Sequence, residues 1–251
     1  MIELSGAAKR WGGGSGIGPL SFRVEKGEFV ALLGGSGCGK TTTLKMINGL
    51  ITPDAGSVSV DGIALGAEPI WKPRRRIGYV FQEVGLFPHM TVARNIAVGP
   101  GLAGWDKPRI AAATAEFLKL GALPEDIGQR LPSALSGGQR QRVGVARALA
   151  AGPPVMLMDE PFGALDPITR DALGRDYRAL HERLGLTTVM VTHDVMEALL
   201  LADRIIVMDA GAILADDTPS ALLSDKAPPS VRALMETPRR QAARVEALAH
   251  G

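Results

Sequence analysis

Short apolar runs recur along the chain, each bounded by glycine or by polar residues. Their length of about four to six residues is typical of strands that are buried on both faces of a sheet. Residues 56–62, "GSVSVDG", instead alternate between apolar and polar positions, which predicts a half-buried strand. The predicted buried strands are residues 29–33, 77–81, 155–158, 187–192 and 204–208.

Segments with the apolar spacing of a helix separate several of these runs. After residues 29–33, Leu44, Ile47 and Leu50 follow at helical spacing, and Gly49 predicts the end of that helix. Further helical stretches lie between the last three apolar runs. Strands that alternate with helices predict an α/β protein with a mainly parallel sheet and helices on both faces.

The character of the chain changes between residues 84 and 149. "TVARNIAV", "PRIAAATAEFLKLGA" and "SGGQRQRVGVARALAA" have helical periodicity and contain much alanine. We therefore predict a mostly helical insert between the strands of residues 77–81 and 155–158. The stretch from about residue 225 onward contains "APPS" and then an Ala/Arg/Glu-rich helix candidate, which we expect to be peripheral.

Composition and charge limit the classes of protein that fit. A chain of 251 residues suits one large domain, or one domain with a subdomain. The net charge of +2 argues against a dominant nucleic-acid surface. The single cysteine, Cys38, excludes an internal disulfide and fits a reducing compartment. The N-terminus lacks the apolar region of a secretory signal, and no uncharged apolar run is long enough to span a bilayer. We therefore expect a soluble protein, whose membrane role would need other subunits.

A glycine-rich segment, "GGSGCGKT" at residues 34–41, matches the phosphate-binding loop G-x-x-x-x-G-K-[ST]. Its backbone N–H groups can surround phosphate oxygens, and the following helix adds its positive N-terminal dipole. Lys40 would reach the β- and γ-phosphates of ATP, and the Thr41 hydroxyl would bind Mg²⁺. The alternative, a glycine-rich turn with an incidental lysine, is disfavoured by the position between a strand and a helix. The predicted nucleotide-contacting residues are Gly34, Gly35, Ser36, Gly37, Cys38, Gly39, Lys40, Thr41 and Thr42.

Two acidic residues follow the strand in "VMLMDEP". The carboxyl ends of parallel strands are where such sheets bind ligands. Asp159 would hold Mg²⁺ there, and Glu160 would polarise the attacking water as a general base. An ordinary acidic strand-to-helix turn is the alternative, and it is disfavoured in a chain that also carries a phosphate-binding loop.

A second candidate for anion binding is "LSGGQRQR" at residues 135–142. Ser136 could cap a helix, while Gly137 and Gly138 leave backbone N–H groups open at its start. Taken alone, this segment would be better interpreted as an ordinary cap with a flexible beginning.

Together these motifs resemble those of the ATP-binding subunits of ABC transporters. The phosphate loop, "LSGGQ", "LMDEP", "ALD" at residues 164–166 and "VTHD" at residues 191–194 occur in the order and approximate spacing of that family, across residues 1–225. The resemblance implies a P-loop NTPase core formed by residues 1–83 and 150–225, with an N-terminal antiparallel β portion. It also implies an inserted helical subdomain at about residues 84–149 and a peripheral tail at residues 226–251.

The same resemblance implies a head-to-tail dimer that holds two ATP molecules between its subunits. The "LSGGQ" residues of one chain would contact the γ-phosphate that the other chain holds. Asp166 would communicate across the dimer. The implied contacts across the dimer come from Ser136, Gly137, Gly138 and Gln139.

Three further residues acquire roles only through the resemblance. Gln82 would approach Mg²⁺ and the attacking water, and His193 would contact the γ-phosphate and hold the geometry of Glu160. Trp11 would stack on the adenine ring. A polar strand end, a structural histidine and a packed aromatic are the respective alternatives.

The segment "RRRIGYVFQEVGLFPHMTVARNIAVGPGLAGW", residues 74–105, closely resembles importers of quaternary-amine osmoprotectants such as glycine betaine, carnitine, choline or proline betaine. Glu83 departs from the glutamine expected there, and Gly35 replaces a frequent proline. The resemblance implies transmembrane permease subunits, indirectly a solute-binding protein, no nucleic-acid partner, and a peripheral place at the cytoplasmic face of the membrane.

Three alternatives stay open. The same machine could import another small solute, such as an amino acid, a sulfonate or a thione-bearing betaine. The chain could instead be a soluble ABC ATPase that acts on ribosomes, DNA repair or Fe–S assembly, although it lacks a second cassette and long coiled coils. A nucleotide sensor that does not hydrolyse ATP is disfavoured because Glu160 and His193 are both present.

Overall fold

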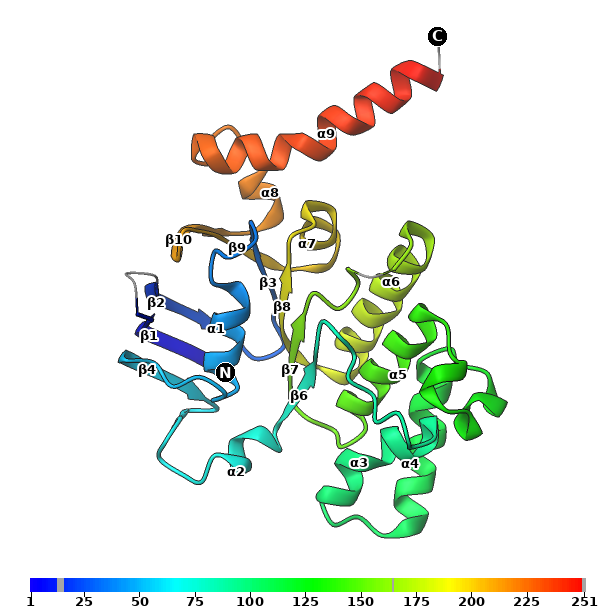
Figure 1. Cartoon of the computed structure of the whole chain (residues 1–251). Coiled ribbons are helices and arrows are strands. Elements are labelled where there is room, and N and C mark those ends of the chain that lie inside the picture. The colour runs from blue at the N-terminus through cyan, green and yellow to red at the C-terminus, as the bar shows by residue number, and fades with distance from the viewer. Residues whose placement is uncertain (13–15, 164, 250–251) are drawn as a thin grey trace.

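The computed structural model describes residues 1–12, 16–163 and 165–249. Its central sheet has six strands: β3 (Phe29–Gly34), β6 (Ile77–Val80), β7 (Val155–Asp159), β8 (Thr187–Thr192), β9 (Arg204–Asp209) and β10 (Ala212–Asp217). Their order is β10-β9-β3-β8-β7-β6, and all neighbours are parallel except β10 and β9 (Figure 1). The predicted α/β architecture with a mainly parallel sheet is confirmed.

A smaller antiparallel sheet forms the N-terminal part of the molecule. Its strands are β1 (Ile2–Arg10), β2 (Gly16–Val24), β4 (Ala55–Val60) and β5 (Ile63–Ala64). They lie in the order β2-β1-β4-β5, which confirms the antiparallel N-terminal portion. This sheet and α1 (Lys40–Ile47) bury their apolar side chains against one face of the central sheet. That face is therefore covered by a helix and a second sheet together, rather than by helices alone.

The opposite face of the central sheet is covered by helices. They include α6 (Pro167–Leu184) and α7 (Val195–Leu201), joined by the C-terminal α8 (Pro219–Leu222) and α9 (Pro229–Ala249). Phe29 of the sheet and Tyr177 of α6 are fully buried here, with their rings edge to face at a centroid distance of 5.8 Å. Two separate apolar cores thus hold the central sheet between them.

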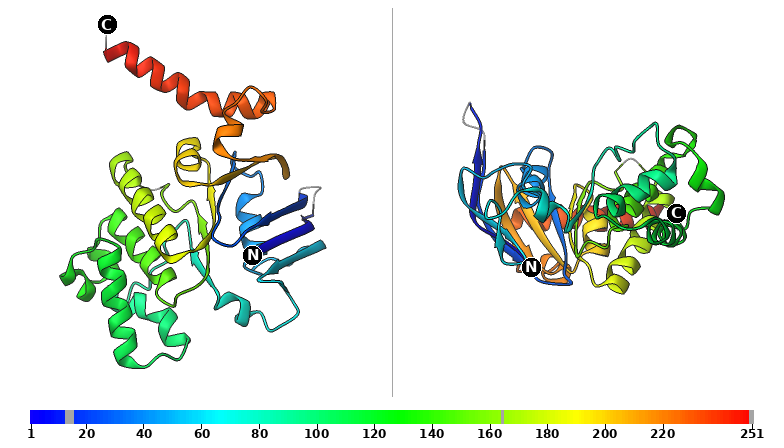
Figure 2. Two further views of the ribbon diagram at one scale, coloured as in Figure 1. Left: turned by 180° about the vertical axis from the view of Figure 1, so that it is seen from behind. Right: turned by 90° about the horizontal axis from the view of Figure 1, so that it is seen from below.

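Helices predominate between β6 and β7, as predicted. They are α3 (Val92–Leu102), α4 (Lys107–Leu120) and α5 (Gly137–Leu149), with the short 3₁₀ helices η1 (Glu125–Gln129) and η2 (Pro132–Ala134). Thr91, Asp106 and Ser136 each begin one of the three α-helices by accepting a hydrogen bond from a first-turn N–H group. The three helices contact one another and lie on the side of the molecule away from β1, β2 and β4 (Figure 2). Their separation into a subdomain stays a prediction.

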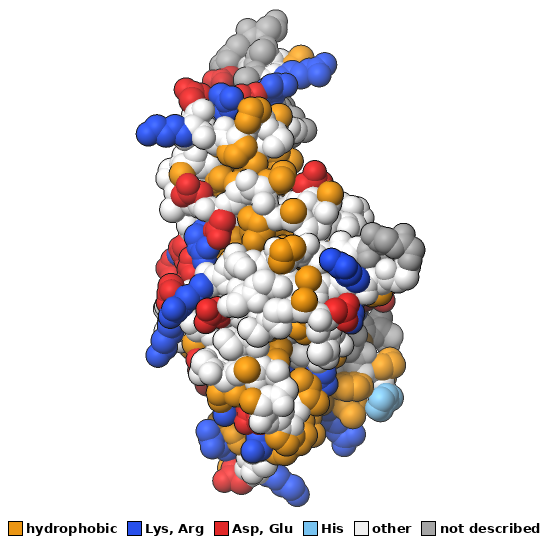
Figure 3. All heavy atoms as spheres, turned by 90° about the vertical axis from the view of Figure 1, so that its left-hand side faces the viewer, with side chains coloured by type: hydrophobic (Ala, Val, Ile, Leu, Met, Phe, Trp, Pro, Cys, Tyr) orange, Lys and Arg blue, Asp and Glu red, His pale blue; other side chains and the backbone are white. Residues whose placement is uncertain are grey.

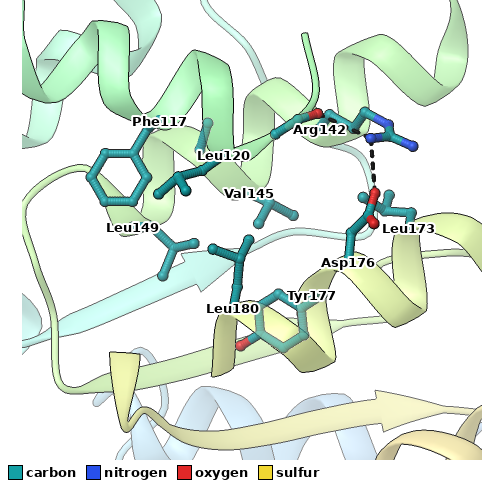
Figure 4. A pocket seen from close by; sticks show the side chains of 11 residues that line it. Phe117, Leu120, Arg142, Val145, Leu149, Leu173, Asp176, Tyr177 and Leu180 are labelled. Atoms are coloured by element: carbon teal, nitrogen blue, oxygen red, sulfur yellow. Dashed lines mark hydrogen bonds and ion pairs between the residues drawn. The ribbon is translucent and has the colours of Figure 1, made fainter. Parts of the chain in front are cut away.

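A small apolar cavity of about 10 Å³ lies where α4 and α5 meet α6 (Figure 4). Phe117, Leu149 and Tyr177 are among the side chains around it. At its edge, the guanidinium of Arg142 donates to the Asp176 carboxylate at 3.1 Å and to a backbone carbonyl of the α4 end at 3.0 Å. Because the cavity is apolar and about the size of one water molecule, we interpret it as a packing gap.

The C-terminal helix begins inside the core and then leaves it. Val231 and Met235 are only 1% exposed and belong to the core that covers α7. The first half of α9 is therefore not peripheral, in contrast to the expectation for the tail, whereas its second half points away from the rest of the molecule (Figure 1, Figure 2).

Surface charges of both signs are interspersed on the face that contains the antiparallel sheet (Figure 3). Hydrophobic side chains gather at the lower end of that face, where Figure 1 has α2 (Trp71–Arg74). Trp71 is half exposed there and Ile70 is also exposed. Among the helices that the structure describes, none combines the length and the apolar character needed to cross a bilayer.

Candidate functional site

The glycine-rich loop connects the end of β3 to the start of α1. Gly37 and Gly39 have φ values of +78° and +103°, in the left-handed region that favours glycine. A Cβ atom at Gly39 would lie 2.4 Å from the side chain of Ile17, so this position has no room for a larger residue. The sequence therefore closes a tight loop whose N–H groups lead into the N-terminus of α1.

Lys40 is held at the centre of this loop. Its Nζ atom donates to the carbonyl oxygens of Gly34 and Gly35, both at 2.8 Å, and the residue is 5% exposed. Cys38 is buried beside it, at 3.8 Å from Sγ to Nζ, while Ser36 is exposed. The ammonium group therefore lies inside the loop, next to the place where backbone N–H groups of a loop of this type bind phosphate.

Thr41 and Asp159 meet across a separation of 118 residues in the sequence. The Thr41 hydroxyl donates to Oδ1 of Asp159 at 2.8 Å. Burial raises the pKa of Asp159, and the hydrogen bond from Thr41 opposes this shift. One carboxylate and one hydroxyl are oxygen donors of the kind that Mg²⁺ uses when a substrate phosphate and water complete its shell. The residues present therefore fit a magnesium ion next to a bound nucleotide.

Glu160 lies at the centre of a second group of polar residues. Oε2 of Glu160 accepts a hydrogen bond from Nε2 of Gln82 at 3.1 Å, and Nδ1 of His193 lies 3.2 Å from the same oxygen. The three residues follow β6, β7 and β8, which are neighbours in the sheet.

The backbone of Glu160 adopts an unusual conformation, with φ at +45°. Its N–H group donates to the carbonyl of Val191 on β8 at 3.0 Å, which anchors the turn. Left-handed conformations of residues other than glycine are costly and cluster at functional sites. Both side-chain contacts of the Glu160 carboxylate are to Oε2, and no hydrogen bond to Oε1 is formed among the described residues.

The "LSGGQ" residues form the start of α5 and not part of the phosphate loop of the same chain. Ser136 and Gln139 make a capping box, in which each side chain accepts from the backbone N–H of the other, at 3.2 and 3.0 Å. A Cβ atom at Gly137 would meet nothing within 4 Å, whereas one at Gly138 would lie 2.8 Å from Thr169. Helices α1 and α5 belong to the cores on opposite faces of the sheet, so the structure does not bring these two candidate anion sites together.

Asp166 and Trp11 complete the predicted set. Asp166 is exposed and caps α6 by accepting from the backbone N–H of Thr169 at 3.0 Å. Hydrogen bonds from Thr169 lower the pKa of Asp166. Trp11 is 43% exposed and directly follows β1. Residue 164, which opens the "ALD" sequence, lies outside the described residues, and Thr42 lies in the first turn of α1.

Sequence reasoning did not single out Arg170, although it lies within "MDEPFGALDPITR". The structure places its guanidinium 3.0 Å from the carboxylate of Asp194, the residue after His193. The available signal was a basic residue four positions after the helix cap Asp166. Its acidic partner, Asp194, is 24 residues away in the sequence, so the pair could not be recognised before the structure was known.

With this geometry in place, comparison with known proteins identifies the family. A sequence profile described as "ABC transporter" matches residues 17–163, which is more than half of the chain. The chain belongs to the ABC transporter family. This ABC cassette also resembles the solved dimeric structure of the ATP-binding cassette MJ0796 in a post-hydrolysis state bound to ADP and Pi. That likeness has a TM-score of 0.80 and 33% identity, over 87% of this chain and 99% of the other.

Curated relatives of this ABC cassette include ATP-binding proteins named for several transported solutes. The chain is 47% identical to the choline transport ATP-binding protein OpuBA of Bacillus subtilis, over 90% of this chain and 60% of OpuBA. It is also 47% identical to the glycine betaine uptake system ATP-binding protein YehX of Escherichia coli, over 92% of this chain and 75% of YehX. The sulfate/thiosulfate import ATP-binding protein CysA of Caulobacter vibrioides is 48% identical, over 87% of this chain and 65% of CysA. The chain spans about three-fifths of the length of the first curated relatives it matches.

Proposed function

We propose that this chain is the ATP-binding and ATP-hydrolysing subunit of an ABC importer, which powers uptake of a quaternary-amine osmoprotectant such as glycine betaine, carnitine or choline. Two copies would work head to tail at the cytoplasmic face of the membrane, on separate permease subunits. The observation that carries the chemistry is the carboxylate of Glu160, contacted by Gln82 and His193 beside the Thr41–Asp159 pair.

Nucleotide binding is the task of the glycine loop. The backbone N–H groups of residues 34–42 and the ammonium of Lys40 would bind the phosphates, and Trp11 would stack on the adenine. A magnesium ion bound to Thr41 and Asp159 would neutralise charge on the β- and γ-phosphate oxygens. Lys40 already lies inside the loop, so nucleotide binding would exchange its carbonyl contacts for phosphate contacts.

Glu160 would act as the general base in hydrolysis. Its Oε1 would accept the proton of the attacking water, while Gln82 and His193 hold Oε2 and so fix the direction of the carboxylate. His193 is 59% exposed on its side chain and Glu160 22%, which leaves both open to a substrate. Gln82 joins this group to the segment that leads into the helices, so movement of that segment would alter the water-binding geometry.

The second copy would complete each site. Because α5 begins away from the phosphate loop of its own chain, Ser136, Gly137, Gly138 and Gln139 would act on a nucleotide held by the partner. The N–H groups at the start of α5 and the open space at Gly137 suit the approach of a phosphate. Asp166, exposed at the start of α6, would face the partner as well.

A groove of about 340 Å³ beside the Gln82 segment offers a place for the permease. Phe81 and Phe87 line it and are 44% and 40% exposed. Arg147 also lines the groove and donates to the carbonyls of Val84 and Gly85 at 2.6 and 2.8 Å. An apolar, partly aromatic groove that adjoins the glutamine of the site would connect permease movement to hydrolysis.

The solute is proposed from the relatives. Six of them carry the names of choline, carnitine, glycine betaine or osmoprotectant systems, at 44–48% identity. A second candidate is import of another small solute, because the sulfate/thiosulfate relative is 48% identical. Residues that touch ATP would be the same in both cases, so the partners decide the solute.

The proposal is tested on the complex captured from native membranes with this chain as bait. Its ATPase rate is measured in lipid with the solute-binding protein and with glycine betaine, choline, carnitine, sulfate or amino acids. We expect stimulation by one quaternary amine, and a rate at least about a hundredfold lower in the Glu160→Gln complex. Stimulation by sulfate alone would favour the second candidate. Capture without any membrane subunit would contradict the transport role.

A further inference from the structure

Arg170 lies between two loops that contribute to the proposed site. It belongs to the first turns of α6, four residues after Asp166. Its Nη2 atom donates to the carbonyl of Leu165 at 3.1 Å, and its Nη1 atom donates to Oδ2 of Asp194 at 3.0 Å. One guanidinium therefore holds the backbone just before Asp166 and the carboxylate just after His193.

The loop on the His193 side is itself tightly bonded. Asp194 begins α7 by accepting from the N–H groups of Met196 and Glu197, at 2.8 and 3.2 Å. Glu197 is 8% exposed and accepts from the Thr192 hydroxyl at 2.6 Å. Its other oxygen lies 3.6 Å from Nε of Arg170, so the cation faces two carboxylates. Thr192 and Asp194 thus fix the backbone on both sides of His193.

We infer that Arg170 is a positioning residue. It couples the position of the backbone at Leu165 and Asp166 to that of His193, and through His193 to that of Glu160. The inference rests on the proposed function, in which Asp166 faces the second copy. A shift of the carbonyl of Leu165 would pull on the guanidinium, whose planar fork bonds both loops at once. Asp194 would then shift, and with it the neighbouring His193, which lies 3.2 Å from the Glu160 carboxylate.

Turnover in the full chain gives the first test. We expect Arg170→Ala to lower kcat about tenfold, within the range of coupling measured for such contacts, while KM for MgATP changes less than about twofold. Arg170→Lys should recover only part of the rate, because one ammonium cannot span both loops as the guanidinium does. The matched control is Arg175→Ala, since Arg175 lies on the same helix and pairs with the exposed Asp171. An unchanged kcat for Arg170→Ala would overturn the inference.

A double-mutant cycle distinguishes an effect of Arg170 through Asp194 from a general loss of structure. Asp194→Asn removes the charge but keeps a side chain that caps helices equally well. If Arg170 acts through Asp194, the kcat of the double variant should equal that of Arg170→Ala alone. Losses that multiply would show two independent effects and contradict the link.

Hydrogen exchange tests the same contact without turnover. In the nucleotide-free full chain, Arg170→Ala should speed exchange at the amides of Met196 and Glu197, which bond to Asp194, and Arg175→Ala should not. Unchanged protection of both amides would refute the link between the loops. If the wild-type chain bound ATP without hydrolysing it, the proposed function would fail, while the exchange result would still decide whether Arg170 holds the two loops.

Discussion

At Asp159, folding and the proposed binding of Mg²⁺ make opposite demands on one carboxyl group. The residue is 6% exposed, and burial raises its pKa, which means that the folded chain disfavours its ionised form. Binding of Mg²⁺ requires that same ionised form. An ionised Asp159, which the proposed metal site needs, would therefore lower the stability of the nucleotide-free protein.

Asp159→Asn should stabilise the nucleotide-free protein and abolish Mg²⁺-dependent turnover. The folded pKa lies above the unfolded value, so the ionised carboxylate lowers stability at neutral pH. This loss shrinks as the pH falls through the folded pKa towards the ordinary value of 3.8. Thermal melting with a chelator should show a rise in Tm of about 2–4 °C for each kcal/mol regained at pH 7.5, and this rise should shrink as the pH is lowered towards 3.8. The control is the exposed Asp225→Asn; a lower Tm for Asp159→Asn would contradict this account.

Glu160→Gln should remove turnover but keep nucleotide binding. The amide oxygen can still accept from Gln82 and His193, but the group cannot take a proton, so kcat should fall by about 10²–10⁴. ATP binding should change little, and the variant should accumulate as an ATP-bound dimer on gel filtration. Glu182→Gln, the same substitution on the surface of α6, is the control. An undiminished hydrolysis rate would remove Glu160 as the base.

At the scale of single elements, two neighbouring glycines at the start of α5 differ in the space around them. An added methyl group at Gly137 meets open space, whereas one at Gly138 meets the stiff β-branched side chain of Thr169 at 2.8 Å. Packing within the chain therefore restricts Gly138 but not Gly137.

Gly137→Ala should keep the Tm of the monomer or raise it slightly, but lower turnover at least about tenfold, because the methyl group would lie between α5 and the nucleotide of the partner. Gly138→Ala should instead destabilise the monomer by about 1–3 kcal/mol. Chemical denaturation and ATPase assays check both variants. Thr169→Ser removes the crowding methyl group and should restore the stability of Gly138→Ala; without that recovery, the clash is not the cause.

The elements differ in how well the sequence predicts them, and the reason is physical. The five parallel strands of the central sheet are mostly buried on both faces, so their apolar runs are continuous, and the sequence predicts each to within about two residues. The sequence pattern does not predict β10, the antiparallel edge strand, which is largely exposed. Strand β1 was not predicted from its residues because a bulge interrupts its alternation. Ile2 and Leu4 are buried, Gly6 has a φ of +61°, and burial resumes at Ala7 rather than at the next alternate position.

The candidate site shows the same contrast. Lys40, Thr41 and Asp159 lie in contiguous motifs whose chemistry is local, and the structure brings them together across the sheet. The contacts of Arg170 depend on how α6 packs against α7, which no short motif encodes. Roles that need a second chain, such as that of Ser136, stay predictions because one chain holds only half of each proposed site.

At the scale of the whole molecule, the order of the strands determines which candidate site residues meet within one chain. Strands β6, β7 and β8 are neighbours, so Gln82, Glu160 and His193 meet at one sheet edge within a single chain. The two helices with candidate anion-binding starts, α1 and α5, belong to the cores on opposite faces of that sheet. In the proposed head-to-tail pair, twofold symmetry would place each α5 start against the phosphate loop of its partner and so produce two equal sites.

Mixing two damaged chains tests this arrangement directly. In the Glu160→Gln background, Lys40→Ala damages the phosphate loop, and Gly137→Arg blocks the α5 start at a position with open space in the monomer. Alone with ATP, each variant should stay monomeric on gel filtration. Mixed, the two should form a dimer, because the pair contains one site built from the intact loop of one chain and the intact α5 of the other. If loop and α5 served the same chain, mixing would restore nothing, and a dimer of either variant alone would show that its damaged part is not needed.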